Sequence, residues 1–159
     1  VEFTETGRLY VLDPQRLALA VDWRCVEMAA DAGGALRALR NAGVQIVYVV
    51  TGGGDSDALR QTLTERDLPD GPIVSWDARR GTITGGLPVA RKHLPALVLL
   101  ATDRNDLRSW AEALDMAVVS VAPDWIAVAA RVSDAAKALR NADFDATSPA
   151  DVQAALAQP

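Results

Sequence analysis

A buried β-strand between two helical segments constrains this chain most, because such alternation is typical of a parallel α/β sheet. Residues 45–50 (Gln-Ile-Val-Tyr-Val-Val) form an almost continuous run of apolar and β-branched side chains. An amphipathic stretch that stops at Gly43 precedes this run, and Thr51 with three glycines follows it before a second helical pattern opens at Asp55. A strand without polar alternation is buried on both faces, as in a parallel sheet covered by helices. The pattern therefore predicts the interior of an α/β sheet.

The rest of the chain continues the alternation of strands and helices. We expect strands at residues 8–12, 17–22, 73–76, 82–84, 97–101 and 117–121, the first of them at an edge or paired with the N-terminal segment. We expect helices at residues 27–42, 56–67, 87–94, 106–115 and 132–141, with a short extended piece at 125–128. This order predicts an α/β fold with a Rossmann-like, open and mostly parallel sheet and helices on both faces.

The same pattern predicts how the chain divides into domains. No linker is long enough to split it, and no insertion after Asp22 or Thr51 is long enough to fold as a substantial cap. We therefore expect one α/β domain at residues 1–145. A C-terminal helical tail at 146–159 follows, with Ser148 and Pro149 at the start of a helix over 149–157,.

The composition excludes several kinds of function. Of the 159 residues, 50% are hydrophobic and 23% are charged, which is ordinary for a soluble globular protein,. A net charge of −5 argues against a general affinity for nucleic acid or for an anionic membrane surface,. One cysteine, Cys25, and one histidine, His93, exclude a disulfide framework and a Cys-rich or multi-His metal site,. We expect both side chains to have structural rather than catalytic roles.

The sequence contains no apolar run of membrane-spanning length, so we expect a soluble domain without a transmembrane segment,. No remnant of a signal peptide is recognisable, and no feature assigns a compartment. Because the chain begins at Val1 rather than at a methionine, we expect a processed or excised product.

Three of the predicted strands end in polar residues. Asp22 ends one strand, Thr51 follows the next, and the segment 102–106 (Thr-Asp-Arg-Asn-Asp) follows a third. In α/β sheets, ligands bind where the carboxyl ends of parallel strands meet. One carboxylate from each of two strands, with a hydroxyl and the N–H groups of Gly52, could hold Mg²⁺ together with a phosphate. The sequence therefore predicts a phosphate site at this edge of the sheet.

These strand ends resemble the motifs of the haloacid-dehalogenase superfamily. Its first motif is an apolar strand ending in Asp-x-Asp-x-Thr, and its second is a strand ending in Thr or Ser. Its third motif is a Lys or Arg, and its fourth is an acidic cluster after another strand. The likeness is greatest to the lipin-type phosphatidate phosphatases and to the related C-terminal domain of phosphatidylinositol-transfer proteins. Residues 39–52, 68–76 and 102–107 carry it, within residues 9–121.

The resemblance implies a nucleophile and a set of metal ligands. Asp22 matches the aspartate that forms an aspartyl-phosphate and also binds Mg²⁺,. The backbone carbonyl of Arg24 would be a second ligand. The third would be Asp106 or Asp103.

The resemblance also implies a set of phosphate-binding groups. Thr51 and the amide of Gly52 match the groups that hold the phosphoryl oxygens. Arg91 or Lys92 is the nearest match to the cation of the third motif. An open site without a cap implies a large phosphorylated ligand, and the expected partner is a phosphorylated small molecule or a phospholipid headgroup.

The first motif departs from the family pattern at two positions. Its second aspartate, which protonates the leaving group and later activates water, is Arg24 here, and its threonine is Val26. A guanidinium stays charged at neutral pH and can do neither task. The loss of general acid–base help costs about 10² to 10⁴-fold in rate. Arg24 would also oppose a nearby metal ion, yet it would attract a phosphate.

Three functional hypotheses remain open at this point. The first is a phosphatase-like domain centred on Asp22 that binds a phosphorylated ligand with weakened or absent turnover. The second is a non-catalytic module that uses the same fold to recognise a phospholipid headgroup or a protein, which Arg24 favours. The third is an unrelated doubly wound domain in which Asp22 and Asp106 only cap the segments that follow them.

Overall fold

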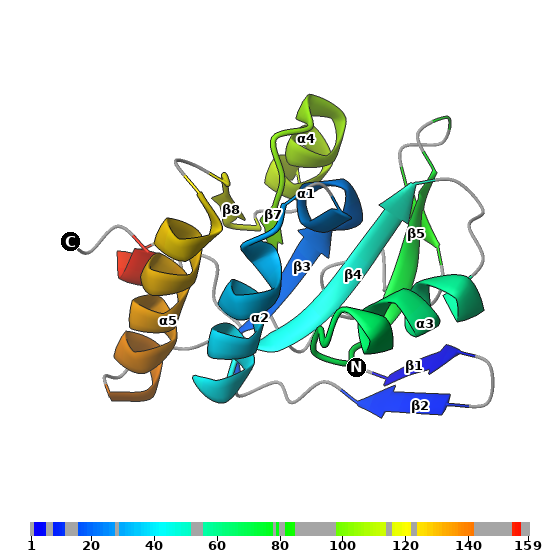
Figure 1. Ribbon diagram of the computed structural model, residues 1–159. Coiled ribbons are helices and arrows are strands. Elements are labelled where there is room, and N and C mark those ends of the chain that lie inside the picture. Colours follow the sequence, from blue (N-terminus) through cyan, green and yellow to red (C-terminus); the bar gives the residue numbers. More distant parts are fainter. Residues whose placement is uncertain are drawn as a thin grey trace.

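A six-stranded sheet forms the centre of the molecule in the computed structural model (Figure 1). The structure describes residues 2–5, 8–11, 16–27, 29–51, 56–77, 79, 82–84, 98–113, 116–121, 124–141 and 154–156. The sheet strands are β3 (Ala18–Asp22), β4 (Gln45–Thr51), β5 (Ile73–Asp77), β6 (Thr82–Thr84), β7 (Val98–Ala101) and β8 (Val118–Val119). Their order across the sheet is β6-β5-β4-β3-β7-β8. The predicted α/β class is confirmed.

All neighbouring strands of this sheet are parallel except β6, which pairs antiparallel with β5 at one edge. Numbered by their order in the chain, the five parallel strands lie in the spatial order 3-2-1-4-5, which is that of Rossmann-like sheets. The order reverses between β3 and β7. Ligands of open α/β sheets bind beside such a switch point, at the carboxyl ends of the strands.

Strand β3 lies in the middle of the sheet and is buried along its whole length. Leu19 pairs with Ile46 on one side and with Leu99 on the other. At the carboxyl end, Asp22 lies beside Val49 of β4. The continuous apolar pattern of β3 and β4 thus has its physical reason, because both faces of each strand are covered.

Strands β1 (Glu2–Glu5) and β2 (Arg8–Val11) form a separate antiparallel sheet of two strands. Phe3 pairs with Tyr10 in this hairpin. The prediction that the strand at 8–12 pairs with the N-terminal segment is confirmed.

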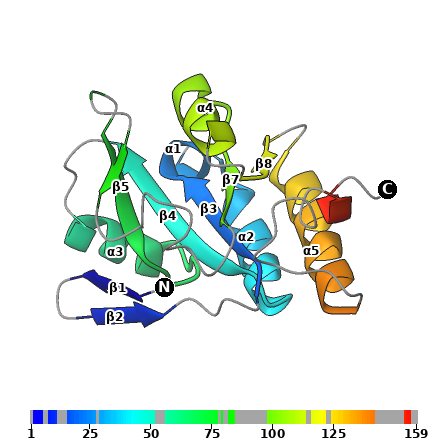
Figure 2. The same cartoon turned by 180° about the vertical axis from the view of Figure 1, so that it is seen from behind.

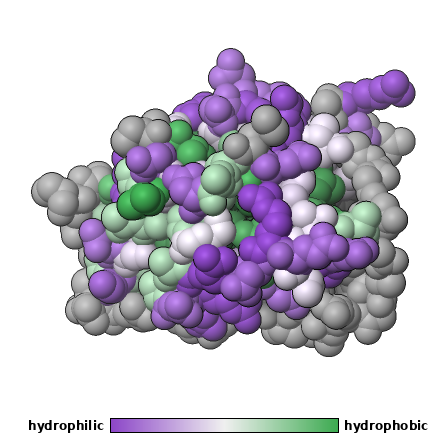
Figure 3. All heavy atoms as spheres, in the orientation of Figure 1, coloured by the Kyte–Doolittle hydropathy of each residue, from purple (hydrophilic) through white to green (hydrophobic). Residues whose placement is uncertain are grey.

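The helices are α1 (Trp23–Glu27), α2 (Ala32–Asn41), α3 (Ser56–Glu65), α4 (Asn105–Ala113) and α5 (Trp125–Asn141). Helices α2 and α5 pack against each other. Helix α2 lies in front of β3 and β4 in Figure 1 and behind them in the reverse view of Figure 2. Hydrophilic side chains cover much of the surface over α2 and α3 on the face seen in Figure 3.

The prediction of one helix over residues 27–42 was wrong, because the chain forms two helices with a break between them. Helix α1 ends at Glu27 and α2 begins only at Ala32. Between them the N–H of Ala29 bonds to the carbonyl of Val26, and the N–H of Ala32 bonds to that of Ala29. These three-residue turns replace the four-residue bonds of an α-helix.

The prediction of an extended piece at 125–128 was also wrong, because α5 starts at Trp125. The Asp124 carboxylate accepts a 2.9 Å hydrogen bond from the N–H of Ala127, and its carbonyl accepts one from Val128. Asp124 is therefore the N-cap that allows the helix to begin early. Trp125, Val128 and Val132 are buried at helical spacing, so packing overrides the β propensity of the two valines.

The segment 68–72 passes close to the middle of β4. The Tyr48 hydroxyl donates a 2.6 Å hydrogen bond to the carbonyl of Pro69, and the Tyr48 N–H donates to that of Pro72. A Cβ atom on Gly71 would lie 2.1 Å from the carbonyl oxygen of Ile46. Only glycine fits at this position, so the end of the α3–β5 connection is fixed against the sheet.

The remaining expectations concern the chain termini and segments outside the sheet. The predicted helix at 87–94 lies outside the described residues, as does most of the predicted helix at 149–157. Residues 154–156 are helical, and Ala155 is buried in the core. In the described part of the chain, no helix has the length and apolar character needed to span a membrane.

Candidate functional site

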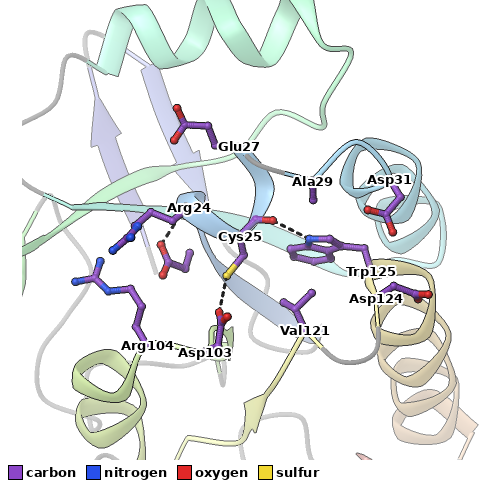
Figure 4. Close-up of a pocket in the computed structure, with 11 residues that line it drawn as sticks. Arg24, Cys25, Glu27, Ala29, Asp31, Asp103, Arg104, Val121, Asp124 and Trp125 are labelled. Atoms are coloured by element: carbon purple, nitrogen blue, oxygen red, sulfur yellow. Dashed lines mark hydrogen bonds between the residues drawn. The ribbon is translucent and has the colours of Figure 1, made fainter.

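A cavity of about 720 Å³ lies at the carboxyl end of the sheet, beside the switch point between β3 and β7 (Figure 4). Its walls come from the end of β3, from α1 and the turn before α2, from the loop after β7, and from the start of α5. The lining residues are Asp22, Arg24, Cys25, Glu27, Ala29, Asp31, Asp103, Arg104, Val121, Asp124 and Trp125.

Asp22 lines this cavity and is almost fully buried, with 1% of its surface exposed. One carboxylate oxygen, Oδ2, accepts a 3.1 Å hydrogen bond from the hydroxyl of the buried Thr102. The other, Oδ1, accepts a 3.2 Å hydrogen bond from the N–H of Arg24. A buried carboxylate needs such partners to stay in one position. The two bonds hold the Asp22 carboxylate at the cavity wall.

Cys25 and Asp103 form a second contact in the cavity. The Cys25 thiol donates a hydrogen bond to Oδ1 of Asp103 over 3.2 Å. Burial, followed by this hydrogen bond and the charge of Asp103, raises the pKa of the Cys25 thiol to about 12. The thiol is therefore protonated at neutral pH and is a poor nucleophile. The Cys25 carbonyl accepts a 2.9 Å hydrogen bond from the indole of Trp125, which ties α1 to α5.

Arg104 connects the ends of two strands. Its guanidinium donates to the hydroxyl of Thr51 and forms a 3.1 Å ion pair with Asp106. The side chain is 19% exposed. Arg104 also lines the cavity that Asp22 lines, so its charge is held in a fixed place beside the buried carboxylate.

Asp106 lies in the first turn of α4 and does not line this cavity. Its Oδ2 accepts a 2.9 Å hydrogen bond from the indole of Trp76. Partial burial raises the pKa of Asp106, but hydrogen bonds from Trp76 and from the N–H of Leu107 and the charge of Arg104 outweigh it, and the net pKa is lower than usual. The carboxylate thus serves as the partner of Trp76 and Arg104.

The structure brings together only part of the predicted site. Asp22, Asp103 and Arg24 line one cavity. Thr51 lies next to it through its contact with Arg104, whereas Asp106 is turned towards Trp76. Gly52, Arg91 and Lys92 lie outside the described residues, as does His93.

The charges in the cavity are unevenly distributed. Among the lining residues that the structure describes, five are acidic and two are basic. In Figure 4 the side chains of Arg24 and Arg104 lie on the same side of Cys25, while those of Asp31 and Asp124 lie on the other side, beyond Trp125. The arginine side also holds Glu27, and it is the part of the cavity where an anion would find cationic partners,.

The donor set for Mg²⁺ is smaller than the sequence predicts. In the part of the chain that the structure describes, no group of three or more His, Cys, Asp or Glu side chains is arranged to hold a metal ion. Asp22 and Asp103 share the cavity. Two carboxylates are enough for Mg²⁺ when phosphate oxygens and water complete its shell. These two carboxylates therefore suit a cation that arrives with a phosphorylated ligand. They suit a permanently bound metal ion less well.

Sequence reasoning placed Thr102 and Arg104 in a polar strand end but gave neither residue a role, and it gave Trp125 no part in the site. Thr102 and Arg104 belong to the polar segment after β7, and their position directly after an apolar strand was the available signal. Trp125 lies more than twenty residues further along the chain, and no sequence pattern indicates that its indole reaches Cys25.

No protein-family model, curated protein or solved structure matches this chain. A proposal for its function therefore has to come from the residues of the cavity and from the strand order.

Proposed function

We propose that this chain is a HAD-like, phosphatase-type domain that binds a phosphorylated ligand in the cavity at Asp22, with little or no turnover. The observation that carries this proposal is the sharing of one cavity by the buried Asp22 carboxylate and two arginines, Arg24 and Arg104. The cavity also lies at the switch point of a Rossmann-like sheet, where such folds bind their ligands,.

Arg104 and Arg24 contribute to anion binding in different ways. The Arg104 guanidinium is already held by Thr51 and Asp106, so little side-chain entropy is lost when it contacts a phosphoryl group,. Arg24 is exposed and adds a second planar donor on the same side of the cavity. Guanidinium groups bind phosphoryl oxygens in pairs of parallel hydrogen bonds. Together the two side chains offset the negative charge of the ligand.

In this proposal Asp22 would be the nucleophile, and it would react slowly. Both carboxylate oxygens accept hydrogen bonds, which holds the group in one orientation. The position two residues later, where an acid would protonate the leaving group, carries Arg24. Without that acid, about 10² to 10⁴-fold in rate is lost. Turnover is then confined to esters with good leaving groups, such as aryl phosphates.

Mg²⁺ is proposed to bind together with the ligand. Asp22 and Asp103 would supply its protein oxygens, and the ligand and water would supply the rest. When bound, the ion would neutralise charge on the phosphoryl group. It would also offset the acidic excess of the cavity lining, so we expect phosphate affinity to rise when Mg²⁺ is added.

A second candidate function is a non-catalytic module that recognises a phosphorylated headgroup or protein through the same cavity. The exposed side chain of Arg24 at the position of the missing acid favours it. The two functions share the binding site and differ only in turnover. An aryl phosphate assay on the wild type and on Asp22→Asn separates them.

Calorimetric titration with inorganic phosphate tests the proposal. We expect binding that Mg²⁺ strengthens, and a loss of affinity of about tenfold or more in Arg24→Ala and in Arg104→Ala, since charge-assisted hydrogen bonds contribute about 1.5–3 kcal/mol. Arg131→Ala, which removes an exposed arginine of α5 outside the cavity, is the matched control and leaves the affinity unchanged. Equal affinities in all four proteins, or no binding, would overturn the proposal.

A further inference from the structure

A second cavity of about 450 Å³ adjoins the first. It lies between α1, α3, the carboxyl end of β4 and the first residue of β5. Its lining residues are Trp23, Arg24, Glu27, Val50, Thr51, Ala58, Leu59, Thr62, Arg66 and Ile73.

The two cavities share part of their walls. Arg24 and Glu27 line both. Thr51 lines the second cavity and accepts a hydrogen bond from Arg104, which lines the first. The two arginines proposed to bind the phosphoryl group therefore stand at the boundary between the cavities. A ligand held by them can extend from one cavity into the other.

The second cavity is apolar on most of its walls. Val50, Leu59 and Ile73 supply aliphatic side chains, and Trp23 supplies an aromatic one. The Trp23 ring is fixed edge-on against Tyr48, with 6.1 Å between the ring centroids, and the Arg66 guanidinium lies 5.9 Å from the Trp23 ring. Arg66 itself donates hydrogen bonds to the carbonyls of Val26 and Ala29. This wall is therefore held in place before a ligand binds.

The hydroxyl groups of the second cavity already have partners. Thr62 donates to the carbonyl of Ala58 in its own helix, and Thr51 accepts from Arg104. A sugar or another polyol would find Arg24 and Glu27 as partners only where this cavity meets the first one, and along the aliphatic wall its hydroxyl groups would lose their hydration without replacement,. An apolar group loses nothing by the same transfer and gains about 25 cal/mol for each Å² removed from water.

We propose that the natural ligand is an organic phosphate whose phosphoryl group is attached to a compact apolar group, such as an aromatic ring. The phosphoryl group lies at Arg24 and Arg104, and the ring lies against Trp23, Val50 and Leu59 in the second cavity. This inference rests on the proposed function, because it needs the phosphoryl group to be held at the boundary. It adds the chemical class of the ligand.

Calorimetry with phenylphosphonate and methylphosphonate tests this inference, since neither P–C bond can be hydrolysed by a phosphatase. We expect phenylphosphonate to bind about tenfold or more tightly than methylphosphonate, from the ring area it buries. Ala58→Trp places a large side chain in the second cavity from an exposed helical position. It abolishes the preference for the phenyl compound and leaves methylphosphonate binding unchanged. Gln61→Trp, an exposed residue of the same helix outside this cavity, is the matched control and keeps the preference.

The possible outcomes separate the two proposals. Equal binding of both phosphonates would leave the proposed function standing and overturn the apolar subsite. A phenyl preference that survives Ala58→Trp would also overturn it, because the ring would lie elsewhere. Binding of neither compound would overturn both proposals.

Discussion

The Thr102 hydroxyl donates a hydrogen bond to the carboxylate of Asp22, and both side chains are buried at the ends of adjacent parallel strands. The same Thr102 oxygen accepts a 3.0 Å hydrogen bond from the N–H of Arg104. The Thr102 hydroxyl thus joins the Asp22 carboxylate at the end of β3 to the loop after β7 that carries Arg104. The contact spans the switch point of the sheet, so it positions both sides of the proposed phosphate site.

Thr102→Val should destabilise the fold, because it leaves a buried Asp22 oxygen without its hydroxyl donor. We expect a loss of about 1–3 kcal/mol in the free energy of unfolding, measured by urea denaturation. Thr102→Ser keeps the hydroxyl, so its free energy of unfolding should fall by less. In Asp22→Asn/Thr102→Val the two effects should be non-additive, since the residues share one bond. Additive effects would show that the bond contributes nothing to stability.

Gly71→Ala and Gly34→Ala should change stability in opposite directions. A methyl group on Gly71 would meet the Ile46 carbonyl at 2.1 Å, so the chain must shift, at a cost of about 1–3 kcal/mol,. Gly34 is exposed within α2, and a Cβ atom there would lie 3.9 Å from the guanidinium of Arg37. Alanine there should stabilise by about 0.5–1 kcal/mol through helix propensity. The melting temperatures of both variants test this prediction. An unchanged melting temperature in Gly71→Ala would contradict the close contact between Gly71 and the Ile46 carbonyl.

Tyr48→Phe should make the protein less sensitive to alkaline pH. Burial and then the charge of Asp70 raise the pKa of the Tyr48 hydroxyl above its usual value, although Arg40 and Arg60 oppose the shift. Above about pH 10 the tyrosine ionises in the unfolded chain but not in the folded one, so stability falls as pH rises. At about pH 8 the wild type should be more stable by about 1 kcal/mol, from the bond to Pro69,. The difference should shrink at about pH 11, and a constant difference would contradict the raised pKa.

Much of the fold could be predicted from the sequence because β3 and most of β4 are buried on both faces. The apolar runs of β3, β4 and β7 can be recognised without knowing which strands they pair with. Their polar ends mark the carboxyl edge of the sheet, where ligands of such folds bind. Asp22 and Asp103 do share a cavity, as that argument predicts. Where the helices begin and end was harder to predict. Local hydrogen bonds of Asp124 start α5 early, and those of the turn at 29–31 separate α1 from α2.

The site itself could be predicted only in part, because side-chain partners are not encoded in spacing. Asp106 follows β7 as a metal ligand would, yet the indole of Trp76 and the guanidinium of Arg104 take its carboxylate. The contact with Trp76 has no sequence signal, since Trp76 lies thirty residues away on β5. The position of Arg104 beside Thr51 likewise depends on which strands are neighbours.

Arg24→Asp should raise turnover of alkyl phosphates if Arg24 replaces a general acid. We expect an increase of about 10² to 10⁴-fold over the wild type, measured as phosphate release in the presence of Mg²⁺. Aryl phosphates need little protonation of the leaving group and should gain less. Asp22→Asn should abolish the activity of both proteins. Activity that survives Asp22→Asn would exclude Asp22 as the nucleophile.

The location of the phosphate site is the central claim, and amide chemical shifts report it directly. Inorganic phosphate added to ¹⁵N-labelled protein should shift most strongly the amides of Arg24, Cys25 and Asp103 to Asn105, at the ends of β3 and β7. The amides of Val118 and Arg131, beside another cavity of the molecule, should not move. The largest shifts at Val118 and Arg131, or no shifts at the ends of β3 and β7, would contradict the claim.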